Sequence, residues 1–334
     1  MSAPRVLVTV ERPLLRRIST PEALARLGDM AESVAFNDDD RAWDAAAVRE
    51  RIGGVTAVLA SWGSCAYDEH LLDAAPELEI ICYAAGTIRG VAPPAVFERG
   101  VRVAHAADFI AMGVAEHTLT VVLALLRRTG EFDAAMRAGR WRGIGPVVDR
   151  ELYGKRYGIV GASKVGRRLI PLLRPFDVQI VVADPYLTES DAQRLGVHKL
   201  ELPDLMRTSD VISIHAPVLP STHHMIDAGM LALIKDDAVL VNNARSALVD
   251  TDALVAELAK ERFDCALDVF DQEPLPTDHP LLGMRRVLLT PHVAGLTPER
   301  RSRLTDAMLD ELERHLNGLP LRHEVTVKQL ESMA

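Results

Sequence analysis

Three side chains in the second half of the chain could together carry acid–base chemistry. A carboxylate, Glu273, lies in Asp-Val-Phe-Asp-Gln-Glu-Pro-Leu-Pro, and an imidazole, His292, lies in Leu-Leu-Thr-Pro-His-Val-Ala-Gly. An arginine, Arg245, precedes both in Val-Asn-Asn-Ala-Arg-Ser. An imidazole exchanges protons near neutral pH, and a guanidinium can bind a carboxylate at two points. Downstream of a nucleotide-binding motif, this set favours hydride transfer assisted by a protonated histidine.

The nucleotide-binding motif is the segment 161–166, which reads Gly-Ala-Ser-Lys-Val-Gly between an apolar run and a helical pattern. The Rossmann fingerprint is G-x-G-x-x-G at such a turn, with the helix N-terminus on the pyrophosphate. Serine replaces the middle glycine, and its hydroxyl could face a phosphate oxygen. Alone, this degraded pattern is equally consistent with an ordinary strand-to-helix turn. We expect cofactor contacts from Gly161, Ser163, Lys164, Val165 and Gly166.

An acidic residue, Asp184, ends the next apolar run, 18 residues after Gly166. A carboxylate at this place can accept hydrogen bonds from both ribose hydroxyls and would repel a 2′-phosphate. The sequence therefore favours NAD over NADP. A solvated carboxylate at a strand end is the alternative interpretation.

Short apolar runs alternate with helical patterns along the chain, which predicts an α/β fold with parallel sheets. In the first part the predicted strands are 6–10, 55–60 and 79–83, and the predicted helices are 21–27 and 68–74. A second, Rossmann-type series has strands at 157–160, 179–183, 211–215, 239–242, 266–269 and 287–289. Its helices are 165–173, 202–207 and 252–258, and a final helix is predicted at 298–316.

The helical pattern at 112–128 is the strongest in the sequence, and its second half is apolar all round. Such a helix must be buried on more than one side. We expect contact with a second subunit, and hence a homodimer, while burial within one chain is the alternative.

Composition argues against several classes of partner. The 334 residues carry a formal net charge of −9 without long blocks of like charge, so nucleic acid is not expected. The apolar run at 6–10 is too short for a signal peptide. The stretch 114–126 is interrupted by Glu116 and His117 and is shorter than the ~20 residues of a membrane span. The three cysteines show no metal signature, and their scatter suggests a reducing, cytoplasmic compartment.

From Asp108 to Gly295 the chain resembles the D-isomer-specific 2-hydroxyacid dehydrogenases. The matching segments occur in the order and at close to the spacing of that family, whereas the part before residue 108 matches only in outline. They read Met-Gly-Val-Ala-Glu-His-Thr, Gly-Ile-Val-Gly-Ala-Ser-Lys-Val-Gly, His-Ala-Pro-Val-Leu-Pro-Ser-Thr, Val-Asn-Asn-Ala-Arg, Ala-Leu-Asp-Val-Phe-Asp-Gln-Glu-Pro-Leu-Pro and Leu-Thr-Pro-His-Val-Ala-Gly.

The resemblance implies an NAD-dependent enzyme that interconverts a 2-keto acid and a D-2-hydroxy acid. Arg245 would bind the substrate carboxylate and polarise the keto oxygen. His292 would protonate that oxygen, and Glu273 would orient the ring and stabilise the imidazolium. No metal ion is expected at this site.

Further roles follow from the same resemblance. In the segment 83–87, Tyr-Ala-Ala-Gly-Thr, backbone N–H groups would bind the substrate carboxylate, although the following Ile88 and Arg89 depart from the family pattern. Trp62 would line the side-chain pocket or serve as a structural tryptophan. The expected substrate contacts in this part are Trp62, Ala85 and Gly86, and the remaining cofactor contacts are Pro217, Thr222, Ala244, Asp268 and Gly295.

The family's architecture implies two Rossmann-like or flavodoxin-like domains. A discontinuous substrate domain would comprise 1–107 and 297–334, a NAD-binding domain would comprise 108–296, and the active site would lie in the cleft between them. One alternative is a phosphoglycerate or phosphite dehydrogenase, for which Arg89 and Arg142 could supply cations. Another is a catalytically poor NAD-sensing protein, similar to the family's co-repressor branch.

Overall fold

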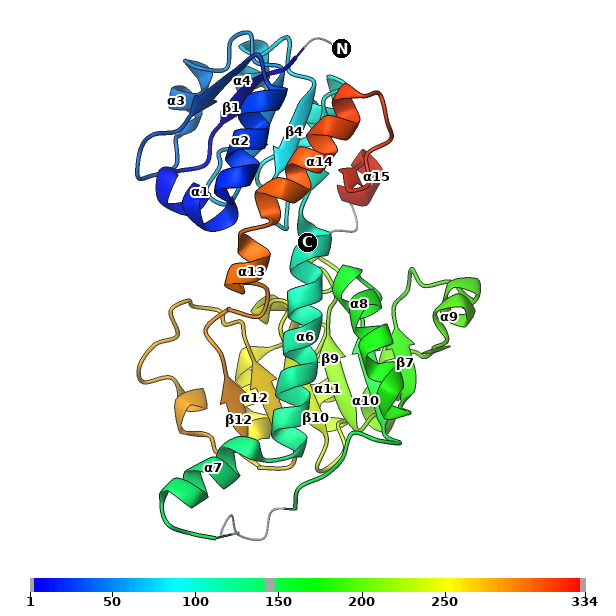
Figure 1. The fold of residues 1–334 in the computed structure, drawn as a ribbon. Helices are drawn as coiled ribbons and strands as arrows, with labels where there is room; N and C mark the ends of the chain where they lie inside the picture. Colours follow the sequence, from blue (N-terminus) through cyan, green and yellow to red (C-terminus); the bar gives the residue numbers. More distant parts are fainter. Residues whose placement is uncertain (1–2, 142–147, 331–334) are drawn as a thin grey trace. The chain divides into compact units, whose positions relative to one another are not determined.

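The computed structural model describes residues 3–141 and 148–330, and Arg142 lies outside them. The chain divides into two compact units, one made of Met1–Ile110 and Leu296–Ala334, the other of Ala111–Gly295. Each unit is built around its own, mainly parallel sheet (Figure 1). The predicted α/β class with two parallel sheets is therefore confirmed.

The first unit contains a six-stranded sheet in the order β13-β5-β4-β3-β1-β2. Its strands are β1 (Arg5–Val8), β2 (Ser33–Phe36), β3 (Ala57–Ala60), β4 (Ile80–Tyr83), β5 (Arg102–His105) and β13 (Glu324–Val325). All pairs are parallel except β13 with β5. The order of β1 to β5 is that of the flavodoxin-like fold.

Helices cover both faces of this sheet and bury two apolar clusters. Leu27 of α2 and Met308 of α14 belong to the cluster on one face, and Leu71 of α4 and Val96 of α5 belong to the other. The helices of this unit are α1 (Arg12–Ile18), α2 (Pro21–Met30), α3 (Ala45–Arg49), α4 (Glu69–Asp73), α5 (Pro94–Glu98), α13 (Pro298–Arg301), α14 (Leu304–Leu316) and α15 (Val327–Leu330).

The second unit contains a seven-stranded, all-parallel sheet in the order β12-β11-β10-β9-β6-β7-β8. Its strands are β6 (Arg156–Val160), β7 (Gln179–Ala183), β8 (His198–Lys199), β9 (Val211–Ile214), β10 (Val239–Asn242), β11 (Asp264–Leu267) and β12 (Val287–Leu289). The strand order reverses between β6 and β9, which is the Rossmann arrangement. Ligands of such sheets bind at the carboxyl ends of the strands beside that reversal.

Helices again sandwich the sheet, with α6 and α8 on one apolar cluster and α10, α11 and α12 on another. The helices of this part are α6 (Ala107–Leu126), α7 (Thr129–Arg137), α8 (Lys164–Leu173), α9 (Glu189–Leu195), α10 (Leu202–Thr208), α11 (Ala228–Ala232) and α12 (Thr251–Leu258). Short 3-10 turns occur at Arg174–Phe176, Ser246–Leu248 and Pro280–Gly283.

The long helix α6 starts earlier and ends sooner than the predicted 112–128, because Arg128 adopts a left-handed conformation with φ 52°. Its 20 residues are long and apolar enough to cross a membrane, unlike the shorter stretch read from the sequence. Half of the helix is buried within the structure, however, and a core helix meets the same criterion. Length and composition are therefore weak evidence for a membrane span.

Two other predicted elements need correction. The helix expected at 298–316 is interrupted after Arg301, so that α13 and α14 are separate helices. The strand expected at 266–269 begins instead at Asp264, and Asp268 lies beyond its end. The strand can start at a charged residue because the Asp264 carboxylate is completely buried and compensated by arginines.

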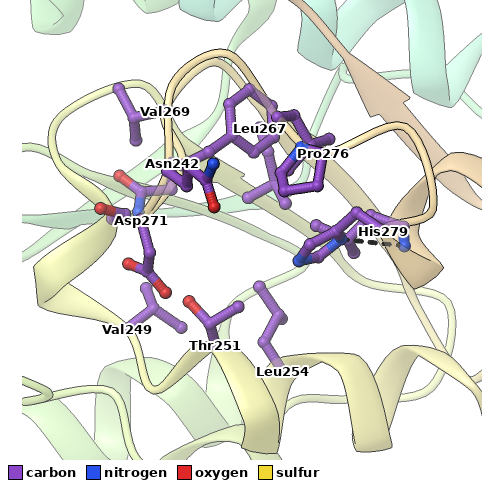
Figure 2. A pocket seen from close by; sticks show the side chains of 14 residues that line it. Asn242, Val249, Thr251, Leu254, Leu267, Val269, Asp271, Pro276 and His279 are labelled. Atoms are coloured by element: carbon purple, nitrogen blue, oxygen red, sulfur yellow. Dashed lines mark hydrogen bonds between the residues drawn. The ribbon is translucent and has the colours of Figure 1, made fainter.

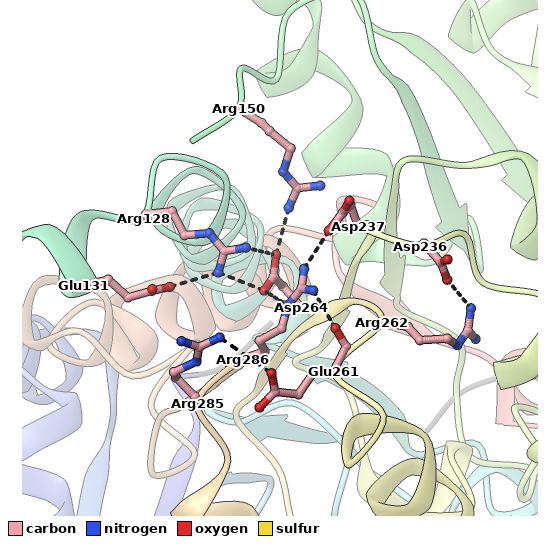
Figure 3. Close-up of polar contacts among 10 residues, drawn as sticks. All are labelled: Arg128, Glu131, Arg150, Asp236, Asp237, Glu261, Arg262, Asp264, Arg285 and Arg286. Atoms are coloured by element: carbon pink, nitrogen blue, oxygen red, sulfur yellow. Dashed lines mark hydrogen bonds and ion pairs between the residues drawn. The ribbon is translucent and has the colours of Figure 1, made fainter. Parts of the chain in front are cut away.

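These arginines form an ion-pair network at the amino end of β11 (Figure 3). Arg128 donates from both terminal nitrogens to the two Asp264 oxygens at 2.9 Å. Arg150 donates to Oδ2 at 2.7 Å, and Arg286 donates from Nε to Oδ1 at 2.8 Å. Because these arginines come from the end of α6, the segment before β6 and the start of β12, the network ties four parts of the unit together.

Candidate active site

The glycine-rich loop between β6 and α8 has no room for side chains at two positions. Gly161 has φ +95°, and a Cβ atom there would lie 2.7 Å from the backbone nitrogen of Ala216. A Cβ atom on Gly166 would overlap the carbonyl oxygen of Gly161. The loop therefore provides the tight turn and the close helix–strand packing that the fingerprint requires.

Ser163 occupies the N-cap position of α8, and its hydroxyl makes no capping hydrogen bond. Lys164 and Val165 follow it in the first turn, where backbone N–H groups have no helical acceptor. The serine leaves the loop's geometry intact, and the open helix end offers donors to an anion. These features fit the pyrophosphate of a dinucleotide.

Asp184 follows β7 and lies directly against this loop. Its Oδ2 atom accepts a hydrogen bond from the Ala162 amide at 2.7 Å, and Oδ1 accepts one from the Tyr186 amide at 2.8 Å. A carboxylate oxygen has two lone pairs, so both oxygens keep acceptor capacity for ribose hydroxyls. The carboxylate thus also holds the loop in place.

The structure brings the predicted acid–base pair together. Nδ1 of His292 and Oε2 of Glu273 lie 2.7 Å apart, and the Glu273 Oε1 atom accepts a hydrogen bond from the Phe270 amide at 3.0 Å. Because the carboxylate is the acceptor, Nδ1 carries a proton and Nε2 is the ring atom that exchanges protons. The His292 and Glu273 side chains remain 46% and 38% exposed, so a reactant can reach the pair.

Burial alone would raise the pKa of Glu273, but hydrogen bonds from His292 and the Phe270 amide outweigh it. The pKa therefore lies below its ordinary value, and Arg245 contributes to this shift through its positive charge. Burial of charge also lowers the pKa of Arg245, partly offset by Glu273. The arginine nevertheless stays cationic at neutral pH, because a guanidinium loses its proton only far above neutrality.

Arg245 follows β10 in a turn that is fixed by its own side chains. Asn242 donates from Nδ2 to the Arg245 carbonyl at 2.9 Å and accepts from the Ala244 amide at 3.1 Å. The guanidinium donates to the Ala244 carbonyl at 2.7 Å, which leaves most of its five N–H groups for other acceptors. The turn therefore holds a cation within electrostatic reach of Glu273.

Asp268 organises the loop that carries the histidine. Its buried carboxylate accepts hydrogen bonds from the Thr290 hydroxyl at 2.6 Å, the Val293 amide at 2.9 Å and the Ala294 amide at 2.9 Å. His292 sits between these anchors in a left-handed conformation with φ 52°. The structure thus gives Asp268 a loop-positioning role that the sequence did not predict. Its expected contact with the cofactor stays a prediction, as does that of Gly295, which follows the loop.

The loop after β9 is closed by Thr222, whose hydroxyl donates to the Pro217 carbonyl at 2.7 Å and accepts from the Leu219 amide at 2.8 Å. Pro217 and Thr222 are therefore part of one turn, which follows the strand next to the glycine-rich loop. Their contact with a cofactor remains a prediction.

In the first unit, the segment after β4 differs from expectation in one detail. The Ala85 N–H already donates to the Tyr83 carbonyl, so it cannot also donate to a ligand without losing that bond.

Two other candidate residues of the first unit have structural contacts. Trp62 is partly buried and packs on both apolar clusters of the unit. Arg89, a candidate for phosphate binding, donates instead to the Leu330 carbonyl at 2.7 Å.

Sequence reasoning missed a polar contact between α6 and the Arg245 turn. Nδ2 of Asn243 lies 3.2 Å from Nδ1 of His117 and donates to the Thr118 hydroxyl at 3.2 Å. Burial lowers the pKa of His117, with partial compensation by the charge of Asp268. The Ala-Glu-His-Thr motif indicated the helix and supported the family resemblance, but no contact was predicted for its polar residues, although they were the available signal.

A cavity of about 220 Å³ is lined by residues from the end of β10 to α12 and from the end of β11 to Leu281 (Figure 2). Leu254, Leu267 and Leu281 form part of its apolar wall, while Thr251 and His279 present polar atoms. The cavity borders Ser246 and Gln272, the neighbours of the two candidate catalytic residues. Among the described residues, no cluster of His, Cys, Asp and Glu side chains could hold a metal ion.

Comparisons with known proteins identify a matching family model and several relatives. Residues 119–294 match the family described as "D-isomer specific 2-hydroxyacid dehydrogenase, NAD binding domain". A glyoxylate reductase from Thermofilum pendens is 36% identical over 258 residues, covering 75% of this chain and 76% of that protein.

A D-3-phosphoglycerate dehydrogenase from Mycobacterium tuberculosis is 33% identical over 299 residues, covering 89% of this chain. The alignment spans 55% of that longer relative. Among solved structures, a phosphoglycerate oxidoreductase from Rhizobium etli superposes with a TM-score of 0.81 at 26% identity, covering 97% and 98% of the two chains.

Proposed function

Because this chain belongs to the D-isomer-specific 2-hydroxyacid dehydrogenases, which bind NAD, we propose that it interconverts a 2-keto acid and the corresponding D-2-hydroxy acid. The observation that carries this proposal is the 2.7 Å contact between His292 and Glu273, beside an arginine and downstream of a dinucleotide-binding loop. Bound NADH supplies the hydride that reduces the keto carbon.

Three side chains bind the substrate and transfer the proton. Arg245 binds the substrate carboxylate and polarises the keto oxygen, because its planar cation can pair with both oxygens of the carboxylate. His292 delivers a proton from Nε2 to the keto oxygen as the carbon is reduced, and it removes that proton in the reverse direction. Glu273 holds Nδ1, fixes the ring and stabilises the imidazolium.

The second unit holds the cofactor in this proposal. The turn at Gly161 and the first turn of α8, from Ser163 to Gly166, bind the pyrophosphate through backbone N–H groups. Asp184 binds the ribose hydroxyls, which selects NAD over NADP. The remaining contacts are assigned to Pro217, Thr222, Ala244, Asp268 and Gly295.

The first unit contributes to substrate binding through the segment after β4, chiefly the Gly86 amide. Trp62 is proposed to contact the side chain of the substrate. We also propose a cytoplasmic homodimer in which α6 contacts the second subunit.

The test is NADH oxidation by purified protein with a panel of 2-keto acids of increasing size: glyoxylate, hydroxypyruvate, pyruvate, phenylpyruvate and 2-ketoisocaproate. NADPH is run in parallel. We expect the wild-type protein to turn over at least one of these acids. In His292→Asn the turnover rate should fall at least about 100-fold, while NADH binding is retained. Turnover that is unchanged in His292→Asn would refute the proton-transfer role.

Phosphorylated substrates and phosphite form a second arm of the same assay, since the mycobacterial relative is named as a phosphoglycerate dehydrogenase. Arg89 is engaged with Leu330, so we expect the non-phosphorylated acids to be preferred. Tight NADH binding without turnover in either arm would instead support the NAD-sensing alternative.

A further inference from the structure

At the end of β4, the protein holds the carbonyl oxygens of the four residues from Tyr83 to Gly86. The Tyr83 carbonyl accepts from the amides of Ala85 and Ala106, and the Ala85 carbonyl accepts from Ala106 at 3.0 Å. The Ser61 hydroxyl donates to the Ala84 carbonyl at 3.0 Å. The Gly86 carbonyl is held by a side chain instead, because Nδ1 of His105 lies 2.8 Å from it.

The amide groups of the same segment behave differently. The N–H groups of Ala84 and Ala85 donate to the carbonyls of Ala60 and Tyr83. The Gly86 N–H has no acceptor among the residues that the structure describes. Because C=O and N–H point in opposite directions in a trans peptide, holding the Ala85 carbonyl directs the Gly86 N–H away from the bond to Ala106. The Gly86 amide is therefore presented as a donor.

His105 is rigidly placed to fix the next peptide unit. It ends β5, lies beside Tyr83 in the parallel register with β4, and donates its own amide to the His323 carbonyl at 3.1 Å. Only 2% of its surface is exposed. A carbonyl can only accept, so Nδ1 carries the ring proton in this contact. The imidazole thus clamps the peptide between Gly86 and Thr87 in one orientation.

We propose that His105 is a positioning residue for the substrate carboxylate. By clamping the Gly86 carbonyl it fixes the backbone on the carboxyl side of the Gly86 amide, so that the glycine cannot swing and carry this donor away from the carboxylate, although His105 touches no substrate itself. The inference rests on the proposed function, in which the Gly86 segment binds the carboxylate of a 2-keto acid. Loss of the clamp frees the peptide to rotate and leaves a partly buried carbonyl without its donor.

The test compares two variants that differ in one hydrogen-bond donor. His105→Asn places an N–H group at the same number of bonds from the backbone as Nδ1, whereas His105→Leu has a similar shape without a donor. For the preferred 2-keto acid we expect KM to rise about tenfold in His105→Leu, which is the loss expected for one hydrogen bond. In His105→Asn, which keeps a donor, KM should stay within about twofold of the wild-type value. The Kd for NADH should be equal in all three proteins.

A matched control comes from a second buried histidine of the same unit. His315 contacts Glu79 at 3.1 Å, near the amino end of β4, whereas Gly86 follows the carboxyl end. His315→Leu removes a buried imidazole without touching the Gly86 segment, and its KM should match that of the wild type. Should His105→Leu fail to fold, His105→Met provides a donor-free side chain that adapts more easily to the site.

The decisive readout is discrimination between pyruvate and its methyl ester, or the equivalent pair for the preferred acid. A defect in carboxylate positioning lowers kcat/KM for the acid and spares the ester, so the acid-to-ester ratio should fall about tenfold in His105→Leu. An equal loss for both compounds, or an unchanged KM, would overturn the inference while leaving the proposed function intact. Absence of wild-type turnover with every 2-keto acid would overturn both.

Discussion

Nδ1 of His292 lies 2.7 Å from Oε2 of Glu273, while the second oxygen of that carboxylate is fixed by the Phe270 amide. The imidazole therefore has one nitrogen committed to the protein and one facing a reactant, which is the arrangement that a general acid–base group needs. The Asp268 carboxylate completes it from the other side by holding the amides of Val293 and Ala294. The carboxylates of Glu273 and Asp268 thus determine where the imidazole ring lies and which of its nitrogens can exchange a proton with a reactant.

Glu273→Gln should lower kcat for keto-acid reduction by about 100-fold, because the amide keeps a hydrogen bond but no longer stabilises the imidazolium. NADH binding should be unaffected, as measured by fluorescence titration. Gln272→Glu is a control, since it changes the neighbouring side chain while keeping Glu273, and its kcat should stay close to that of the wild type. A kcat within a few-fold of wild type in Glu273→Gln would exclude the proposed partnership.

The same pair should make stability depend on acid pH. The pKa of Glu273 is depressed in the folded protein, so the ionised carboxylate stabilises the fold above its unfolded pKa and this contribution is lost as pH falls through the folded pKa. The difference in urea midpoint between wild type and Glu273→Gln should therefore be constant near neutrality and shrink below about pH 4.5, the ordinary value for glutamate. A difference that grows on acidification would contradict the sign of the shift.

Asp268→Asn should destabilise the protein by about 1–3 kcal/mol, because one acceptor oxygen is replaced by an NH₂ group that faces existing donors. The turnover rate should fall by more than the loss of folded protein accounts for, since the loop that carries His292 loses hydrogen bonds that hold it in place. Thr290→Val is the graded control, because it removes only the 2.6 Å hydroxyl contact. Equal turnover in the two variants at matched folding would argue against loop positioning by Asp268.

Much of this site was predictable because it depends on local sequence. The glycine spacing, Asp184, Arg245, Glu273 and His292 are recognised from short motifs, since each belongs to one loop at the end of a strand. The relationship between His105 and Gly86 was not predictable, because β5 was not recognised as a strand. Its sequence, Arg-Val-Ala-His, begins and ends with polar residues, and each of them finds its partner only in the tertiary structure.

The ion-pair network around Asp264 is a second feature that could not be predicted from local sequence. The strand predicted at 266–269 left out Asp264, and no local pattern links this residue to Arg128, which lies 136 residues earlier. Only the packing of α6 against the sheet brings their side chains together. The sequence alone therefore could not show that distant arginines compensate a buried carboxylate. Strands without charged residues at their ends, such as β7 and β10, had the predicted bounds.

Asp184→Asn should reduce the preference for NADH over NADPH at least about tenfold, because the variant no longer repels a 2′-phosphate. Asparagine keeps one acceptor for the amides of Ala162 and Tyr186, so the loop should be less disturbed than in Asp184→Ala. The ratio of kcat/KM for the two cofactors is the measurement. An unchanged ratio would remove Asp184 from cofactor discrimination.

Asp264→Asn should cost about 3–5 kcal/mol of unfolding free energy, because three arginines would lose their shared buried carboxylate. Asp236→Asn is the matched control, since it breaks an arginine pair whose aspartate side chain is 76% exposed and should cost less than about 1 kcal/mol. Urea denaturation of both variants measures the contrast. Equal midpoints would show that the network contributes little to stability.

The proposed homodimer can be tested on the exposed apolar side chains that accompany α6. Met112 on that helix is 41% exposed, and Trp141, which follows α7, is 76% exposed. Large apolar and aromatic side chains of this kind are enriched in subunit interfaces. Trp141→Glu and Met112→Glu should shift the sedimentation coefficient from dimer to monomer, whereas Leu282→Glu, at a side chain that is 53% exposed on another part of the unit, should not. A wild-type protein that sediments as a monomer at micromolar concentration would refute the dimer. A dimer that tolerates both substitutions would place its interface elsewhere.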